Sequence, residues 1–168
     1  MKKKIKDIYK KLFKEKKLKF QRSLSFGDYF TDRWERANLE GFGEGTSVYD
    51  NVLILGKVKV GKNCWIGPNC ILDGKGGLEI GDNCIISAGV HIYSHFFTNN
   101  KKSLSKTVIK NNVYIGPNSI ISLGCEIGNN AIIGALSFVD ENIKSNTKFY
   151  NKVIKVKKKL KKLSNSFI

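Results

Sequence analysis

The chain has 168 residues and a formal net charge of +16 at pH 7, with 30 Lys or Arg against 14 Asp or Glu. This length predicts one domain with terminal tails. No apolar run reaches the roughly 18 residues of a transmembrane helix, and the N-terminus lacks the apolar stretch of a signal peptide, so we expect neither a membrane-spanning nor a secreted protein. The expected location is the cytoplasm, either free or peripheral at the inner face of the membrane.

The positive charge is concentrated at the two ends of the chain. Residues 1–22 hold eleven Lys or Arg and two acids, and residues 144–168 hold nine Lys and no acid. Residues 23–143 hold ten bases and twelve acids. The basic character therefore belongs to the tails. Because no base-reading module accompanies them, we expect no nucleic-acid partner.

Residues 1–22 are predicted to form a basic amphipathic helix. Apolar side chains recur at helical spacing at Ile5, Ile8, Tyr9, Leu12 and Phe13, and lysines fill the other face. Two interpretations stay open. The helix docks on the end of the domain, or it lies on an anionic membrane surface.

Residues 23–47 are expected to be an irregular N-terminal cap, because glycines recur through them. A repetitive domain needs such a cap, since its terminal repeat would otherwise expose its apolar interior. Tyr29, Phe30 and Trp34 are the side chains predicted to cover that end.

From residue 48 to residue 143 the sequence follows a six-residue period. An aliphatic residue recurs every six positions, apart from a two-residue slip in Gly74-Lys75-Gly76-Gly77 and one sixteen-residue interruption. Asn or Gly stands three residues later in ten of the fourteen units, and both tolerate positive φ at low cost. The fourteen aliphatic positions are Val48, Ile54, Val60, Ile66, Leu72, Ile80, Ile86, Ile92, Ile109, Ile115, Ile121, Ile127, Ile133 and Val139.

This period predicts an all-β solenoid whose flat faces stack coil on coil. One unit is a short strand with an inward aliphatic side chain, followed by a corner. Three units make a triangular coil, so the repeats predict about five coils. A β-sandwich of short strands is the alternative, but it does not require a fixed six-residue spacing.

The four cysteines share one column of the repeat, four residues after an aliphatic, where nearly all residues are small or β-branched. They are Cys64, Cys70, Cys84 and Cys125. We interpret them as small buried side chains. No Cys-x-x-Cys pair is present and the two His do not complete a zinc spacing, so we expect no metal site.

The interruption over residues 93–108 is predicted to be an extended loop ejected from one corner of the solenoid. Such insertions usually mark the binding face. His95 stands at the root of this loop, in the column where Asn or Gly is the rule. An imidazole held there is a candidate general base. The alternative is a His that merely tolerates a left-handed turn.

Residues 144–168 are predicted to be a basic tail with a short C-terminal helix. Val153, Val156, Leu160 and Leu163 recur at helical spacing among lysines. This helix is expected to pack on a neighbouring subunit or to lie on a membrane.

Four of the repeats resemble those of the hexapeptide-repeat acyltransferases. They read Ile66-Gly-Pro-Asn-Cys, Ile80-Gly-Asp-Asn-Cys, Ile115-Gly-Pro-Asn-Ser and Ile127-Gly-Asn-Asn-Ala. The segment Gly89-Val-His-Ile-Tyr-Ser-His95 resembles the active-site strand of the maltose/galactoside O-acetyltransferase branch, which includes many polysaccharide-cluster enzymes. The resemblance covers about residues 45–143. It implies a left-handed parallel β-helix and a homotrimer with active sites between subunits.

The resemblance also implies roles for single residues. His95 matches the general base, and acetyl-CoA is the implied cosubstrate, lying in the groove between adjacent prisms. The implied substrate-binding residues are Asn69, Asp73, Tyr93 and Tyr114, and the implied cofactor-binding residues are Ala135, Ser137 and Lys152. The chain departs from the family at Leu136, where Gly is common, and at residues 149–153, which lack proline.

Three functions follow as alternatives. The first is an acetyl-CoA-dependent O-acetyltransferase acting on a sugar of a surface glycan or its precursor, by direct acyl transfer with a His base. The second is an N-acetyltransferase of a nucleotide-linked amino sugar, for which Lys101, Lys102 and Lys106 would contact the diphosphate. The third is a trimeric scaffold without enzymatic activity that has lost CoA binding, as the departures from the family pattern would allow.

Overall fold

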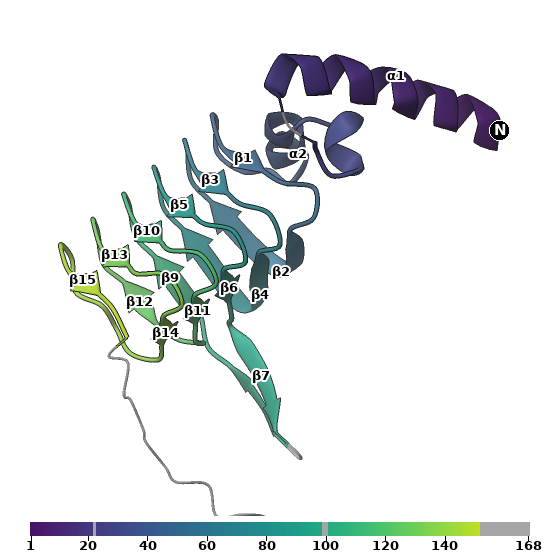
Figure 1. Ribbon diagram of the computed structural model, residues 1–168. Coiled ribbons are helices and arrows are strands. Elements are labelled where there is room, and N and C mark those ends of the chain that lie inside the picture. The colour runs from purple at the N-terminus through teal and green to yellow at the C-terminus, as the bar shows by residue number, and fades with distance from the viewer. Residues whose placement is uncertain (22, 99–100, 152–168) are drawn as a thin grey trace, which may run out of the picture.

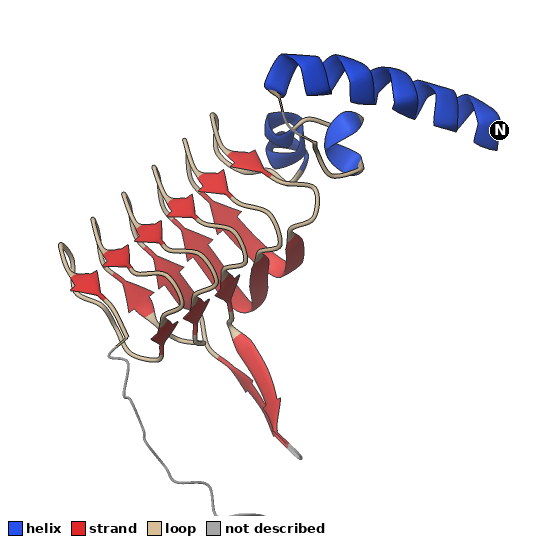
Figure 2. Ribbon diagram, viewed as in Figure 1, coloured by secondary structure: helices blue, strands red, loops and turns tan. Residues whose placement is uncertain are grey.

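The computed structural model describes residues 1–21, 23–98 and 101–151, and it is a parallel β-solenoid of about five turns (Figure 1). The helices gather at the N-terminal end of the solenoid, and an antiparallel hairpin stands out from its side (Figure 2). The solenoid predicted from the six-residue period is thus confirmed. The predicted C-terminal helix and Lys152 lie outside the described residues.

The N-terminal end is built from one long helix and two short ones. They are α1 (Lys2–Phe20), a 3₁₀ helix (Gly27–Tyr29) and α2 (Arg33–Leu39). Within residues 23–47, where an irregular cap was expected, two short helices occupy residues 27–29 and 33–39, and Asp32 caps α2. Its carboxylate accepts hydrogen bonds from the backbone N–H groups of Trp34 and Glu35, at 3.0 and 2.9 Å.

The open end of the solenoid is covered by different side chains from those expected. Ala37 of α2 and Phe42 join the buried core, whereas Phe30 and Trp34 remain about half exposed. Tyr29 is buried, but its ring packs on Tyr9 of α1. Ala37 and Phe42 therefore close the core, and the buried Tyr29 holds α1.

The solenoid has three faces, and its strands pair in parallel within each face. The first face stacks β1 (Ser47–Val48), β3 (Trp65–Ile66), β5 (Ile85–Ile86), β10 (Tyr114–Ile115), β13 (Ile132–Ile133) and β15 (Lys148–Phe149). The long strands β2 (Leu53–Val60) and β4 (Ile71–Ile80) bend around a corner, so each contributes to the second and the third face. The second face adds β6 (His91–Ile92), β11 (Ile120–Ile121) and β14 (Phe138–Val139). The third adds β9 (Thr107–Ile109) and β12 (Glu126–Ile127), with a bridge to Ile143.

The inward column is confirmed as the core. Strand pairing sets Ile66 between Val48 and Ile86, and each inward side chain thus lies over its equivalent in the next coil. Thirteen of the fourteen aliphatic positions are buried, and Ile54 is partly buried against them. The four cysteines are also buried, and all four are free thiols.

The Asn column forms the left-handed corners that the repeat predicts. The backbone at six Asn residues of this column has φ between 54° and 59°, namely at Asn63, Asn69, Asn83, Asn112, Asn118 and Asn130. Their amides also hydrogen-bond from coil to coil, as between Asn112 Nδ2 and Asn130 Oδ1 at 3.1 Å. Asn51 and Asn142 are not among the positive-φ residues of the described chain.

One left-handed corner holds a leucine. Leu136 occupies the turn column with φ 58°, and it is 71% exposed, so packing does not compensate for this backbone conformation. The left-handed conformation costs most residues roughly 1–2 kcal/mol of free energy, a cost that Gly and Asn largely avoid. The departure from the family pattern at this position is therefore a strained corner in the structure.

Replacing Leu136 by Asn should stabilise the protein, because Asn adopts this backbone conformation at lower cost and little apolar contact is lost. We expect a gain of about 1 kcal/mol in the free energy of unfolding, measured by urea denaturation. Leu136→Ala is the matched control, since it keeps a Cβ without the local hydrogen bonding of Asn. An unchanged stability in Leu136→Asn would contradict the strain at this corner.

Candidate functional site

Both departures from the six-residue period lie at the same corner, between the second and third faces. The glycine slip bends β4, and in the next coil the chain leaves the solenoid after β6 and returns at β9. The excursion is an ordered hairpin of β7 (His95–Thr98) and β8 (Lys101–Leu104), which we call the arm. The extended loop predicted here is therefore an antiparallel pair of strands that projects from the prism (Figure 1).

Gly76 allows the base of the arm to lie against this bend. A Cβ at Gly76 would stand 2.2 Å from the Ser94 carbonyl oxygen and 2.9 Å from the Ser105 nitrogen, so any side chain would push the arm away. The backbone N–H of Gly76 instead donates a 2.8 Å hydrogen bond to Ser94 Oγ. The glycine slip that breaks the period therefore makes room for the base of the arm.

Two buried hydroxyl groups fix the two ends of the excursion. Ser94 is fully buried and accepts the Gly76 bond on the outgoing side. On the returning side, Thr107 Oγ1 donates to the Tyr93 carbonyl at 2.7 Å and accepts from the Gly124 N–H at 3.0 Å. The backbone on either side of His95 is therefore held by hydrogen bonds within the solenoid wall.

His95 is paired with a buried carboxylate from the preceding coil. Asp73, on β4, is fully buried and lies in contact with His95 Nδ1. The same carboxylate accepts backbone N–H bonds from Lys75 at 3.0 Å, His95 at 3.2 Å and Ser94 at 3.3 Å. Burial alone would raise the pKa of Asp73. The hydrogen bonds from Lys75, the His95 side chain and Ser94 outweigh it, so the pKa lies below its ordinary value of 3.8.

This contact determines which nitrogen of His95 is available. The ionised Asp73 can only accept hydrogen bonds, so Nδ1 of His95 carries a proton and donates it. Nε2 is then left with its lone pair in the neutral ring. His95 is also absent from the positive-φ residues of the described chain, because it begins β7. The alternative of a His that merely tolerates a left-handed turn is therefore wrong.

The His95 ring borders an apolar hollow of about 450 Å³ between the arm and the second face. Its side chain is 13% exposed, and Phe97 contacts it edge to face with the ring centroids 5.4 Å apart. The hollow is lined by Tyr93, His95, Phe96, Phe97, Ile120, Ser122, Leu123 and Phe138. A proton acceptor thus borders an open hollow with mainly apolar walls, a setting that suits base chemistry.

The structure brings only part of the predicted site together. Tyr93 lines the hollow beside His95, and its hydroxyl lies 3.3 Å from His91 Nδ1. Asp73 is beside His95 but is buried, so its expected role in acceptor binding is corrected to that of holding the imidazole.

The remaining candidates lie elsewhere on the same chain. Asn69 is exposed at the corner between the first and second faces, where Asn51 Nδ2 donates to its Oδ1 at 2.7 Å. Tyr114 is on β10 of the first face. Ala135 is exposed at the corner after β13, whereas Ser137 is buried and its Oγ has no hydrogen-bond partner within the described chain.

Sequence reasoning missed several residues of this site. Gly76 and Ser94 could have been found, since the first lies in the slip and the second immediately precedes His95. Ile120 and Phe138 lie one position before an inward aliphatic, so their outward direction also follows from the period. Nothing in the pattern indicates that the arm folds back over them.

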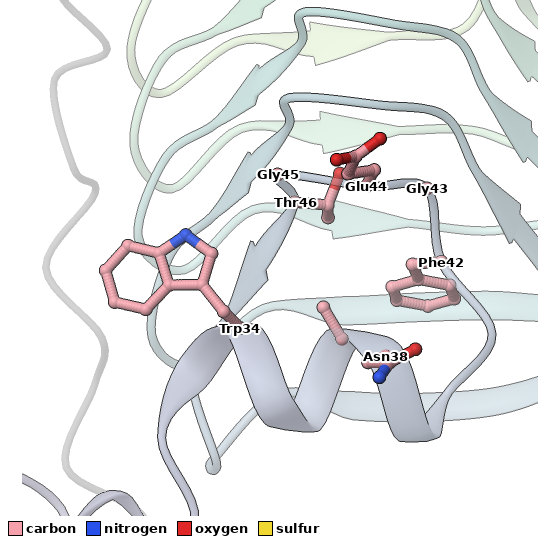
Figure 3. A pocket seen from close by; sticks show the side chains of 8 residues that line it. Trp34, Asn38, Phe42, Gly43, Glu44, Gly45 and Thr46 are labelled. Atoms are coloured by element: carbon pink, nitrogen blue, oxygen red, sulfur yellow. The ribbon is translucent and has the colours of Figure 1, made fainter.

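A second hollow of about 320 Å³ lies at the N-terminal cap. Figure 3 shows Trp34 of α2 on one side of this hollow and Phe42 on the other, with Glu44 and Thr46 between them. It holds one carboxylate and no imidazole or thiol. Across the described ranges, no three His, Cys, Asp or Glu side chains are grouped closely enough to hold a metal ion.

Two family models match the chain, one on each side of the arm. The model for the hexapeptide repeat of succinyl-transferase matches residues 57–94. The model for the bacterial transferase hexapeptide, with six repeats, matches residues 106–140. Residues 95–105 between them are the arm and its return, which do not follow the repeat.

Curated relatives share part of their length with this chain. The bifunctional protein GlmU of Thermodesulfovibrio yellowstonii is 33% identical over 114 residues, which cover 60% of this chain and 24% of that protein. The galactoside O-acetyltransferase of Escherichia coli strain K12 is 32% identical over 96 residues, which cover 53% of this chain and 47% of that protein. The chain thus spans less than half the length of these relatives.

Solved structures share the solenoid. A maltose O-acetyltransferase from Clostridium difficile 630 superposes with a TM-score of 0.66 at 27% identity, over 86% of this chain and 80% of that chain. AntD, an N-acyltransferase from Bacillus cereus solved with dTDP and 3-hydroxybutyryl-CoA, superposes with a TM-score of 0.61 at 25% identity, over 66% of each chain. The repeats, the solenoid and both family models show that the chain is built from the hexapeptide repeats of bacterial transferases.

Proposed function

We propose that this protein is an acetyl-CoA-dependent O-acetyltransferase that acts on a sugar hydroxyl of a surface glycan or its precursor. The observation that carries the proposal is the His95–Asp73 pair at the edge of an apolar hollow. The similarity to galactoside and maltose O-acetyltransferases supports the acceptor class. We assign the reaction to the cytoplasm, where acetyl-CoA is available.

In the proposed mechanism, Nε2 of His95 takes the proton of the acceptor hydroxyl. The oxygen attacks the thioester carbonyl carbon, and the C–O bond forms as the C–S bond breaks. The imidazolium then returns the proton to the CoA sulfur. Asp73 orients the ring and balances its transient positive charge across the Nδ1 contact. No covalent acyl-enzyme is needed.

The walls of the hollow suit an acyl group and a sugar face with few hydroxyls. Phe96 and Phe97 come from the arm, and Ile120 and Phe138 come from the second face. Their rings and aliphatic groups exclude water from the thioester, which favours transfer to the sugar over hydrolysis.

A homotrimer is part of the proposal, and the outward side chains of the three faces support it. The third face carries surface ion pairs, with Lys106 2.6 Å and Lys59 3.4 Å from Glu79. The first and second faces expose apolar side chains instead, including Trp65, Ile85, Tyr114, Ile132, Leu53, Ile71, Ile120 and Phe138. Two adjacent apolar faces on each copy fit a closed threefold ring.

Such a ring would also account for the scattered candidates. Asn69 and Ala135 lie at a corner, and Tyr114 on a face, that do not meet His95 within one chain. A neighbouring copy can present these residues across the subunit boundary, as the resemblance implies. CoA would then lie along that boundary, with Ala135 at its pantetheine arm.

N-acylation of a nucleotide-linked amino sugar is the second candidate. The observation in its favour is the similarity to AntD, an N-acyltransferase solved with dTDP. The sugar nitrogen would attack as the free amine, and the C–N bond would form as the C–S bond breaks. The same base would carry a proton from the nitrogen to the CoA sulfur. Lys101 and Lys102, both exposed on the arm, would supply positive charge for a diphosphate.

Replacing His95 by Gln should lower the turnover number for acetyl transfer by about 10²- to 10⁴-fold, because the general base is lost. Turnover is measured as thiol release from acetyl-CoA with sugar acceptors. The thermal shift on adding CoA should remain close to that of the wild type. Retained turnover would reject His95 as the base, and the absence of any CoA shift in the wild type would favour the scaffold.

Replacing Asp73 by Asn should lower kcat by at least about tenfold but by less than the His95 change, because the ring remains while its orientation and charge partner are lost. The pKa of Asp73 is lowered in the folded state, so its contribution to stability is present above about pH 4 and is lost as the pH falls through the folded pKa. The difference in unfolding free energy between wild type and Asp73→Asn should therefore shrink below about pH 4. A difference that grows below about pH 4 would contradict a lowered pKa of Asp73 in the folded state.

Competition separates the two acceptor classes. Nucleoside diphosphates should leave acetyl transfer to a simple sugar unchanged if the first proposal holds. Inhibition that is relieved by Lys101→Ser with Lys102→Ser would favour the nucleotide-linked amino sugar. Lys59→Ser with Lys110→Ser, on the third face, is the matched control for the loss of two charges.

A further inference from the structure

Helix α1 is attached to the molecule by only part of its apolar stripe. Tyr9 and Phe13 pack on the buried Tyr29, with ring centroids 5.2 and 5.7 Å apart. Phe26 contacts Tyr9 at 5.4 Å, and Lys16 Nζ donates to the Asp28 carbonyl at 3.1 Å. These contacts fix one face of the helix against the N-terminal cap.

The first turns of α1 extend beyond that cap. Figure 1 shows the N-terminal end of the helix projecting away from the solenoid. Ile5 lies four residues before Tyr9 and so continues the same stripe. Ile5 and Ile8 are 46% and 52% exposed, because this end of the helix extends past the surface on which Tyr9 and Phe13 pack.

Exposed aromatic side chains continue this apolar surface. Phe26, which contacts Tyr9, is exposed, and Phe30 packs on it with ring centroids 5.1 Å apart and is also exposed. The exposed Phe26 and Phe30 thus adjoin the apolar stripe of α1 through Tyr9. We call the exposed residues Ile5, Ile8, Phe26 and Phe30 the N-terminal patch.

Lysines surround the N-terminal patch. Helix α1 contains ten Lys and only two acids, Asp7 and Glu15. One of those acids, Glu15, lies 3.9 Å from Lys11. The helix therefore combines exposed apolar side chains with a large excess of positive charge, the combination that favours an anionic bilayer surface.

The positive charge of α1 and its exposed apolar side chains argue against two other partners, a second copy of the chain and a nucleic acid. The α1 helix of a second copy would bring ten further lysines and be repelled. A nucleic acid would be attracted to the lysines but would leave Ile5 and Ile8 in water. Within the described residues, no helix is long and apolar enough to cross a bilayer, so α1 would lie on the surface.

We infer that α1 is a peripheral membrane anchor that lies on bilayers containing anionic lipid, with the N-terminal patch inserted and its lysines at the headgroups. The inference does not depend on acyl transfer, since it concerns a surface remote from His95. It would place the prism beside the membrane with its first coil nearest the lipid.

The test is co-sedimentation of the full chain with vesicles of phosphatidylcholine alone and of phosphatidylcholine with phosphatidylglycerol. We expect binding to the anionic vesicles, at least tenfold weaker binding to the neutral ones, and release at high salt. Replacing Ile5 and Ile8 together by Ser keeps the charge of the chain and should lower the partition coefficient by at least tenfold.

Replacing Leu136 and Tyr150 together by Ser is the matched control, because both are exposed apolar residues at the opposite end of the solenoid. This variant should bind like the wild type, and circular dichroism checks that both variants are folded. Equal binding of Ile5→Ser/Ile8→Ser and wild type would overturn the inference, even if the basic C-terminal segment still attracts vesicles. Equal binding to neutral vesicles, or binding to RNA in preference to anionic vesicles, would overturn it as well.

Discussion

The in-register stacking of one coil on the next is the constraint on which the rest of the structure depends. Each inward side chain lies over its equivalent in the neighbouring coil, as Ile115 lies between Ile86 and Ile133. An extra residue within a strand would turn the buried column outward, so insertions are tolerated only at corners. The glycine slip and the arm are both placed at one corner, and this is why residues of two different coils meet there.

The buried Asp73–His95 pair at that corner contributes both to the stability of the fold and to the proposed catalysis. A carboxylate buried as fully as that of Asp73 is costly unless hydrogen bonds satisfy it. Its donors are the N–H groups of Lys75, Ser94 and His95 together with the His95 ring, and three of these four belong to the base of the arm. The bonds that make the buried charge tolerable therefore also orient the imidazole towards the apolar hollow.

The outer surface divides the molecule into regions of different chemistry. The third face carries ion pairs among Lys59, Glu79 and Lys106, whereas the first and second faces expose apolar side chains. The N-terminal helix lies outside the repeat altogether and carries a large positive charge. A trimeric ring through two faces and a membrane contact through the N-terminal end use different surfaces, so both are geometrically compatible in one assembly.

The sequence by itself determined the solenoid, the inward aliphatic column, the buried thiols and the position of His95 at the root of the insertion. All of these follow from a local period that stacking imposes on every coil, so counting residues recovers them. Only the tertiary structure decided that Asp73 is the buried partner of His95, that the insertion is a hairpin over Phe138, and that Asn69 and Tyr114 lie away from it. Strand pairing sets Leu72 opposite Ile92, so the register would place Asp73 opposite Tyr93. His95 lies two residues further on, where the chain has already left the solenoid, so counting in sixes does not pair it with Asp73.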